Sequence, residues 1–150
     1  MGLGQEPGDL PRHRADEEFR LARGARRAES EYRVPDALSL NQWGLTGRWT
    51  IDKQSSRLVA PNGTIRFRFA ARDVHLVLGS PDGRPIRYVV TLDGKPLGDD
   101  HGVDTDAAGR GTVTGHRLYQ LVRQRDPKGE HVFEIRFLDP GVEAYAFTFG

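Results

Sequence analysis

The sequence predicts an all-β domain, a jelly-roll β-sandwich of about eight to ten short antiparallel strands. Two observations support this fold class. Apolar and polar residues alternate over several short segments, which is typical of strands with one buried face. Gly, Pro, Asn and Asp cluster between these segments at close intervals, which leaves no room for long helices.

The N-terminal part of the chain differs in character from the rest. Residues 1–37 contain prolines, many charged residues and few large apolar side chains, so they are predicted to form an arm or connector before a β-sandwich domain at residues 38–150. Within the arm, residues 15–32 (ADEEFRLARGARRAESEY) are expected to be irregular or partly helical, with Asp16 as the N-cap and Gly24 as an interruption. A chain of 150 residues is expected to form one core.

The clearest predicted strands follow one another after the arm. In residues 64–70 (TIRFRFA), Ile65, Phe67 and Phe69 share one face, and the residues between them are polar. The same alternation recurs in four later segments. In residues 73–79, 86–93, 131–137 and 143–149, the side chains expected to face the core are Val74, Leu76 and Leu78; Ile86, Tyr88, Val90 and Leu92; Phe133, Ile135 and Phe137; and Tyr145, Phe147 and Phe149.

Weaker strand signals fill the remaining sequence. They lie in residues 38–52 (LSLNQWGLTGRWTID), 56–60 (SRLVA), 111–114 (GTVT) and 117–123 (RLYQLVR). Turn signals such as PNG, SPDGRP, DPKG and DPG separate the predicted strands. Each strand needs an opposing apolar layer, which favours a β-sandwich.

The composition excludes several classes of function. Lys and Arg total 22 against 21 Asp and Glu, so the formal net charge of +1 does not indicate binding to nucleic acid or to an anionic membrane. The absence of cysteine excludes disulfides, thiol redox chemistry and cysteine-ligated zinc. No stretch resembles a signal peptide or approaches the roughly 18 apolar residues of a membrane span. We therefore expect a soluble chain without membrane insertion or an export signal, while the compartment and oligomeric state are left unassigned.

Residues 102–113 (GVDTDAAGRGTV) admit two interpretations. Asp104 and Asp106 supply carboxylates one residue apart, which could belong to a calcium loop. However, Ala107 and Ala108 follow, and no Glu stands where a bidentate ligand is needed. The favoured interpretation is a tight hairpin turn, in which Asp106 accepts backbone hydrogen bonds and the following glycines adopt a positive φ or permit a bulge.

The two tryptophans are candidates either for the core or for ligand contact. A sugar ring can pack its C–H bonds on an indole face while neighbouring polar groups bind its hydroxyls. Core packing is the commoner role of such large side chains. Trp43, flanked by Asn41 and Gln42, is the better candidate for a ligand platform, and Trp49, in register with Ile51, is the better candidate for the core.

A polar cluster is predicted near the 102–113 turn. If Tyr119 and Arg123 point outward, they join His101 and Asp104 in a group suited to hydroxyl recognition, whereas the alternative is a solvated strand face. The five histidines show no His-x-x-x-His spacing, and no Ser lies in a Gly-x-Ser-x-Gly elbow. The sequence therefore predicts no catalytic residue, no metal ligand and no cofactor.

Three segments carry a resemblance to a known family: LSLNQWGLTGRWTI, GVDTDAAGRGTVTGHRLYQLVR and the final FEIRFLDPGVEAYAFTFG. Over about residues 32–150, the chain resembles the C-terminal β-sandwich domain of bacterial thioredoxin-like proteins, including the DipZ type of cytochrome c biogenesis proteins. The resemblance implies a jelly roll similar to carbohydrate-binding modules, with an accessory binding role and no catalytic residues. Such proteins usually act outside the cytoplasm. This chain has no Cys-x-x-Cys motif and no thioredoxin βαβ pattern, so redox activity is not carried over.

The resulting hypothesis is a noncatalytic accessory domain that binds glycans weakly. The alternative is an interaction or scaffolding domain that packs on a thioredoxin-domain protein or on itself, and it predicts a dry apolar patch instead of a polar groove. An enzyme on a jelly-roll frame is the least favoured, because convergent His or carboxylate ligands are not found. The candidate ligand-binding residues are Asn41, Gln42, Trp43, His101, Asp104, Tyr119 and Arg123.

Overall fold

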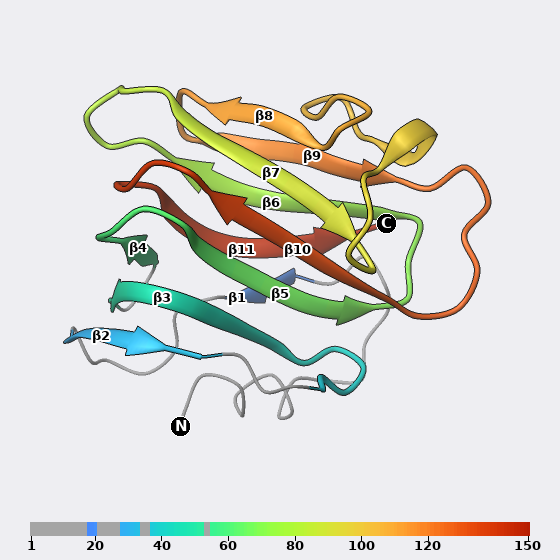
Figure 1. The fold of residues 1–150 in the computed structure, drawn as a ribbon, viewed down its shortest axis with the longest axis horizontal. Helices are drawn as coiled ribbons and strands as arrows, with labels where there is room; N and C mark the ends of the chain where they lie inside the picture. The colour runs from blue at the N-terminus through green and yellow to red at the C-terminus, as the bar shows by residue number, and fades with distance from the viewer. Residues whose placement is uncertain (1–17, 21–27, 34–36, 53–54) are drawn as a thin grey trace.

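The chain folds into an all-β sandwich, as the sequence predicts. The computed structural model describes residues 18–20, 28–33, 37–52 and 55–150, and these contain eleven strands in one antiparallel sheet that curls into two facing layers (Figure 1). Among the described residues, no helix is long and apolar enough to cross a membrane. The elements are β1 (Glu18–Arg20), β2 (Ala28–Tyr32), β3 (Trp43–Ile51), β4 (Ser56–Leu58), β5 (Gly63–Phe69), β6 (Asp73–Gly79), β7 (Ile86–Leu92), the 3₁₀ turn η2 (Gly98–Asp100), β8 (Arg110–Val113), β9 (Arg117–Arg123), β10 (His131–Phe137) and β11 (Glu143–Phe149).

The two layers follow the strand order of a jelly roll. One layer runs β8-β7-β10-β5-β3, and the other continues β3-β4-β11-β6-β9. Strand β3 belongs to both, because residues 43–46 pair with β5 and residues 49–51 pair with β4. Gly47 lies between these two pairings with a φ of 106°, a conformation that favours glycine. The bend at this glycine lets one strand close the sandwich on one side.

The clearest predicted strands are confirmed, and one side chain among them points away from the core where the sequence predicts that it points inward. Strands β10 and β11 begin and end where the alternation does, and Phe147 and Phe149 lie in the core as expected. Tyr145 does not. Ala144 pairs with Leu78 and Ala146 pairs with Val77, so Tyr145 is the extra residue of a β-bulge. Because both flanking alanines are buried, the Tyr145 side chain points out of the sandwich, and its predicted inward facing is wrong.

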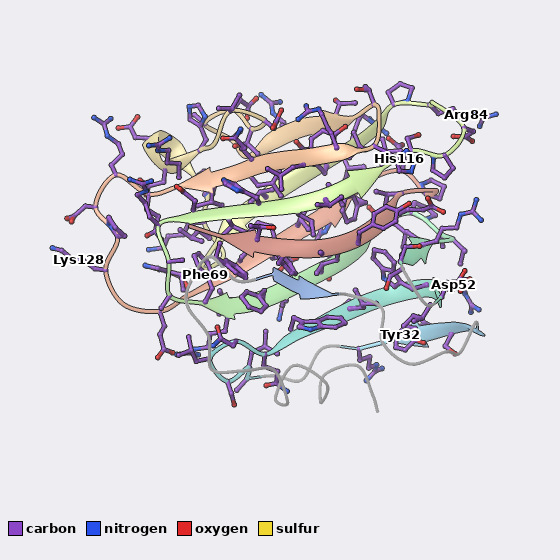
Figure 2. The ribbon with its side chains drawn as sticks, turned by 180° about the vertical axis from the view of Figure 1, so that it is seen from behind. Tyr32, Asp52, Phe69, Arg84, His116 and Lys128 are labelled. Carbon is purple, nitrogen blue, oxygen red and sulfur yellow. The ribbon has the colours of Figure 1, made fainter. Side chains whose placement is uncertain are left out.

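The described part of the arm forms strands rather than a helix. Strand β1 pairs with β11, and β2 pairs with β3, as Figure 2 shows from behind. A strand edge offers unpaired N–H and C=O groups, whereas a short helix with a thin apolar stripe gains little in water. The expected helix is therefore wrong at β1 and β2, and its remaining residues lie outside the described part of the chain.

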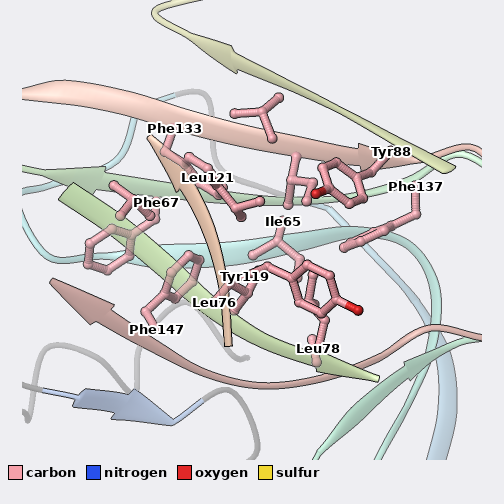
Figure 3. Packing of buried hydrophobic residues seen from close by; sticks show 14 of the residues in the cluster. Ile65, Phe67, Leu76, Leu78, Tyr88, Tyr119, Leu121, Phe133, Phe137 and Phe147 are labelled. Carbon is pink, nitrogen blue, oxygen red and sulfur yellow. The ribbon is translucent and has the colours of Figure 1, made fainter. Parts of the chain in front are cut away.

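The core fills the space between the two layers. Phe67 stacks on both Phe147 and Phe149 at 4.9 Å between ring centroids, and Figure 3 shows Phe67 and Phe147 between opposing strands. Trp43 and Trp49 are both fully buried. The core role is therefore confirmed for Trp49. The expectation that Trp43 offers an exposed ring platform is wrong, because its side chain points into the space between the two layers.

Candidate functional site

The loop before β8 is bound to the outer edge of β9, the last strand of its layer. Gly102 N–H donates to the Leu121 carbonyl at 3.1 Å, and the Thr105 hydroxyl donates to the same oxygen at 2.8 Å. Asp104 N–H donates to the Gln120 carbonyl at 3.0 Å. These bonds satisfy carbonyls that an edge strand would otherwise expose, and they hold residues 101–105 beside the outward face of β9.

A pocket with a volume of about 340 Å³ lies between this loop and the outer face of β6 and β9. Cross-strand pairing builds its floor, because Asp73 lies opposite Arg123 and His75 lies opposite Gln120. A bulge in β9 between these pairs leaves Leu121 without a partner on β6. The lining residues are Asp73, His75, His101, Gly102, Val103, Gln120, Val122 and Arg123.

Several polar side chains in this pocket have no partner among the described residues. Asp73 is only 7% exposed, and its Oδ1 is buried without a hydrogen bond, although its Oδ2 accepts a bond from Arg72 at 3.2 Å. The side chains of His75, Gln120 and Arg123 likewise make no hydrogen bond or ion pair with any described residue. Asp73 is the buried residue of this set, whereas His75 and Gln120 are half-buried and Arg123 is exposed. Because three accessible polar side chains keep free hydrogen-bonding groups beside one pocket, we treat it as a candidate binding site.

The electrostatics of the pocket combine hydrogen-bond donors with acceptors. Burial lowers the pKa of His75, Asp73 opposes this effect, and Arg123 adds to it. The net result is a pKa below the ordinary histidine value, so near pH 7 the imidazole is neutral and offers one donor and one acceptor. Arg123 contributes donors only, and the Gln120 amide contributes donors and an acceptor, so the lining matches a ligand rich in hydroxyl groups.

Asp104 does not line the pocket, but it binds the strand β9 that does. Its carboxylate accepts two bonds from the Arg117 guanidinium, at 2.7 and 3.2 Å, and a third from the Gln120 N–H at 2.8 Å. Burial raises the pKa of Asp104, but the bonds from Arg117 and Gln120 outweigh it and hold that pKa below its usual value. Asp104 therefore acts as a positioning residue for β9.

The 102–113 stretch is a turn, as the favoured interpretation predicts. Asp106 Oδ1 accepts bonds from the N–H groups of Ala108 and Arg110, both at 2.9 Å, and Gly109 has a φ of 83°. Both carboxylates of the supposed calcium loop are thus occupied by protein donors. The stretch is not a hairpin, however, because the strand that follows it, β8, pairs with β7.

The remaining sequence-predicted residues lie away from the pocket. Tyr119 is fully buried, and its hydroxyl donates to the Gly115 carbonyl at 2.7 Å and accepts from the Thr114 N–H at 3.0 Å, so its expected outward position is wrong. Asn41 adopts a φ of 67° and bonds the Arg68 carbonyl beside β5, and Gln42 follows it. The structure brings His101 and Arg123 together in the pocket, with Asp104 behind them, but it does not bring Asn41, Gln42 or Trp43 there.

Sequence reasoning missed Asp73, His75 and Gln120. Alternation within residues 73–79 already places His75 on the polar face of its strand, which is the available signal. The pairing of β6 with β9, which assembles these residues, has no local signature.

Residues 10–150 match the protein family described as "Thioredoxin like C-terminal domain". The chain belongs to this family. Among curated relatives of this thioredoxin-like C-terminal domain are the DipZ proteins of Mycobacterium bovis and Mycobacterium tuberculosis, each 27% identical over 116 residues. The match covers 77% of this chain and 14% of each DipZ protein, so the domain corresponds to a small part of those relatives.

Solved structures with the same fold include two family two carbohydrate esterases. The enzyme from Clostridium thermocellum, determined in complex with cellohexaose, aligns with a TM-score of 0.51 at 16% identity, over 65% of this chain and 27% of that chain. The enzyme from Cellvibrio japonicus aligns with a TM-score of 0.50 at 12% identity, over 89% of this chain and 32% of that chain. At such identities, the likeness establishes the fold of the thioredoxin-like C-terminal domain and no activity.

Proposed function

We propose that this domain is a noncatalytic accessory module that binds glycans weakly through the pocket between β6, β9 and residues 101–103. The observation that carries the proposal is that the pocket is lined by the polar side chains of His75, Gln120 and Arg123, which keep free hydrogen-bonding groups among the described residues. Sugar hydroxyls both donate and accept hydrogen bonds, so they can bind neutral His75, Gln120 and Arg123. Phosphate would satisfy the arginine but would repel the aspartate.

The shape and apolar parts of the pocket also suit a sugar. Val103 and Val122 line it beside the polar groups, and a sugar ring presents both C–H bonds and hydroxyls. The cellohexaose complex of the Clostridium thermocellum esterase makes cello-oligosaccharides a sensible first probe series. Weak affinity is expected because, in the part of the chain that the structure describes, no large aromatic side chain lines the pocket.

The noncatalytic role is inferred from the chemistry of the lining. Among the described residues that line the pocket, there is no Ser, Thr, Cys or Lys side chain that could act as a nucleophile. Asp73 and His75 are not hydrogen-bonded to each other, so they do not form the oriented base that acyl transfer requires. An accessory role also fits a domain that corresponds to 14% of its DipZ relatives.

Titration of the purified domain with cello-oligosaccharides, followed by NMR chemical shifts, tests the proposal. We expect the largest shifts at His75, Gln120 and Arg123, and about tenfold weaker binding in Arg123→Gln, because a charge-assisted hydrogen bond is lost. Arg84→Gln is the matched control, since Arg84 lies in the exposed segment 81–85. Binding that is unaffected by Arg123→Gln would exclude the pocket as the site.

A protein partner is the second candidate function. Val103 is 78% exposed at the pocket, and Leu118 on neighbouring β9 is 37% exposed, so this side of the domain carries accessible apolar side chains. A thioredoxin domain is the partner that family membership suggests. Mixing the two domains and following the NMR signals of Val103 and Leu118 tests this candidate, and unchanged signals at millimolar concentrations would argue against it.

A further inference from the structure

Tyr145 is an aromatic side chain on the same outer face as the pocket. The β11 bulge turns it outward between the buried Ala144 and Ala146. Bulges often redirect a side chain near functional sites. Without this bulge, strict alternation would place Tyr145 in the core with Phe147, so the bulge is what supplies an aromatic ring to this face.

Its neighbours hold the Tyr145 ring in one orientation. The Tyr145 hydroxyl donates to Glu143 Oε1 at 2.8 Å, and the His116 ring meets Tyr145 in an edge arrangement with 5.9 Å between centroids. His116 Nε2 lies 3.4 Å from the same Glu143 oxygen. His116 itself lies over Gly79, where any Cβ would collide with the imidazole. A ring that is already oriented loses little conformational entropy when a ligand packs on it.

A strip of side chains connects the pocket to Tyr145. On β6, the outward residue after His75 is Val77, which lies opposite the exposed Leu118 of β9. On its other side, β6 pairs with β11 around the Tyr145 bulge, where Val77 and Leu78 meet Ala146 and Ala144. His75 and Leu78 are three residues apart, or about 10 Å along a strand. Figure 2 shows this face from outside, with His116 labelled at the end away from Lys128.

We propose that the ligand of this face is a linear oligosaccharide, which binds one unit in the pocket and packs a later unit on the Tyr145 ring. This inference rests on the proposed function of the pocket. This strip begins at the polar groups of the pocket, continues over the Val77 and Leu118 side chains and ends at the Tyr145 ring. It is longer than a single pyranose ring. C–H bonds of a sugar pack well on an aromatic face, while its hydroxyls seek groups such as those of the pocket.

The dependence of affinity on chain length tests this inference. Dissociation constants would be measured by calorimetry or NMR for two probe series, glucose to cellohexaose and N-acetylglucosamine to chitohexaose. We expect the affinity of the wild-type domain to rise about tenfold or more from the monosaccharide to the hexasaccharide of the series that binds. Tyr145→Ala is expected to remove this rise while keeping the monosaccharide affinity.

Two variants separate this inference from the proposed function. Tyr145→Phe keeps the ring and loses the bond to Glu143, so it should retain most of the rise with chain length. Arg123→Gln should weaken binding at every length. The inference would be overturned if the wild-type domain bound short and long chains with equal affinity, or if the affinity of a folded Tyr145→Ala variant still rose with chain length. Either result would leave the proposed function of the pocket unaffected. Absence of binding at all lengths in both series would overturn the proposed function itself.

Discussion

Asp104 holds Arg117 by two hydrogen bonds of 2.7 and 3.2 Å across the gap between the 101–105 loop and β9. The guanidinium in turn lies 3.8 Å from the centroid of the Tyr119 ring. The same carboxylate binds the Gln120 N–H. One partly buried carboxylate therefore ties the loop to the edge strand that forms one wall of the pocket.

Asp104→Asn is expected to destabilise the domain by about 1 to 3 kcal/mol, because charge-assisted bonds to Arg117 are replaced by weaker ones. This corresponds to a fall in Tm of roughly 3 to 10 °C for a domain of this size. Asp82→Asn is the control, since the exposed Asp82 lies 3.8 Å from Arg84 in an open turn and should cost less than about 0.5 kcal/mol. Equal losses in urea unfolding would contradict the role given to Asp104.

Gly109→Ala is expected to prevent stable folding. Gly109 has a φ of 83°, and a Cβ at this position would collide with the Val90 carbonyl oxygen of the neighbouring strand. Gly83 has a similar φ of 76° but open space around it, so Gly83→Ala isolates the backbone strain at about 1 kcal/mol. Circular dichroism and thermal melting of both variants measure the difference, and a Gly109→Ala variant as stable as Gly83→Ala would refute the predicted collision.

The two core tryptophans should respond differently to replacement by phenylalanine. Trp49 Nε1 donates to the Thr46 carbonyl at 3.0 Å, whereas Trp43 Nε1 is buried with no partner among the described residues. Both variants lose ring volume, but only Trp49→Phe also loses a hydrogen bond, so it should be the less stable by about 1 kcal/mol. Neither change should alter glycan affinity, and loss of binding in folded Trp43→Phe would restore Trp43 as a ligand contact.

The stability contribution of Asp139 should disappear in acid. A side-chain bond and a backbone bond from Arg87 lower the pKa of Asp139 to about 2 in the folded domain, against roughly 3.9 when unfolded. A depressed carboxyl pKa stabilises the folded state above about pH 4, and this contribution is lost as the pH falls toward 2. Asp139→Asn should therefore be less stable than the wild-type domain at pH 6 and nearly equal to it near pH 2. A constant difference measured by urea unfolding at both pH values would show that this linkage is absent.

The pKa of His75 should move in opposite directions when its neighbours are neutralised. Arg123 lowers the pKa of this imidazole, and Asp73 raises it. Arg123→Gln should therefore raise the pKa of His75, and Asp73→Asn should lower it further. NMR titration of the His75 ring protons measures both shifts without any ligand, with Arg84→Gln as the unchanged control. Shifts of the same sign in the two pocket variants would be inconsistent with this arrangement of charges.

The strands and most of their inward faces were predictable because they depend on residues two apart in the chain. Ile65, Phe67 and Phe69 must share a face in any extended strand, whatever that strand pairs with. The turn at Asp106 and Gly109 was likewise predictable, since its hydrogen bonds are local. The outward position of Tyr145 was not, because its bulge depends on how β11 pairs with β6.

The candidate pocket could be predicted only in part. His101 and Arg123 were identified from their polar surroundings, yet Asp73 and His75 come from a strand that is distant in sequence and joins them through the β6–β9 pairing. Trp43 was misplaced because its polar neighbours Asn41 and Gln42 suggested exposure, whereas the sandwich closes over it.

The sequence by itself determined a cysteine-free all-β sandwich with its strand segments and local turns, because side-chain alternation and turn chemistry act over a few residues. The tertiary structure decided which strands became neighbours, which tryptophan and tyrosine rings were buried, and which polar groups were left unpaired in one pocket. Those outcomes depend on the free energy of packing two whole layers together, which is a sum over many distant contacts that no single segment contains.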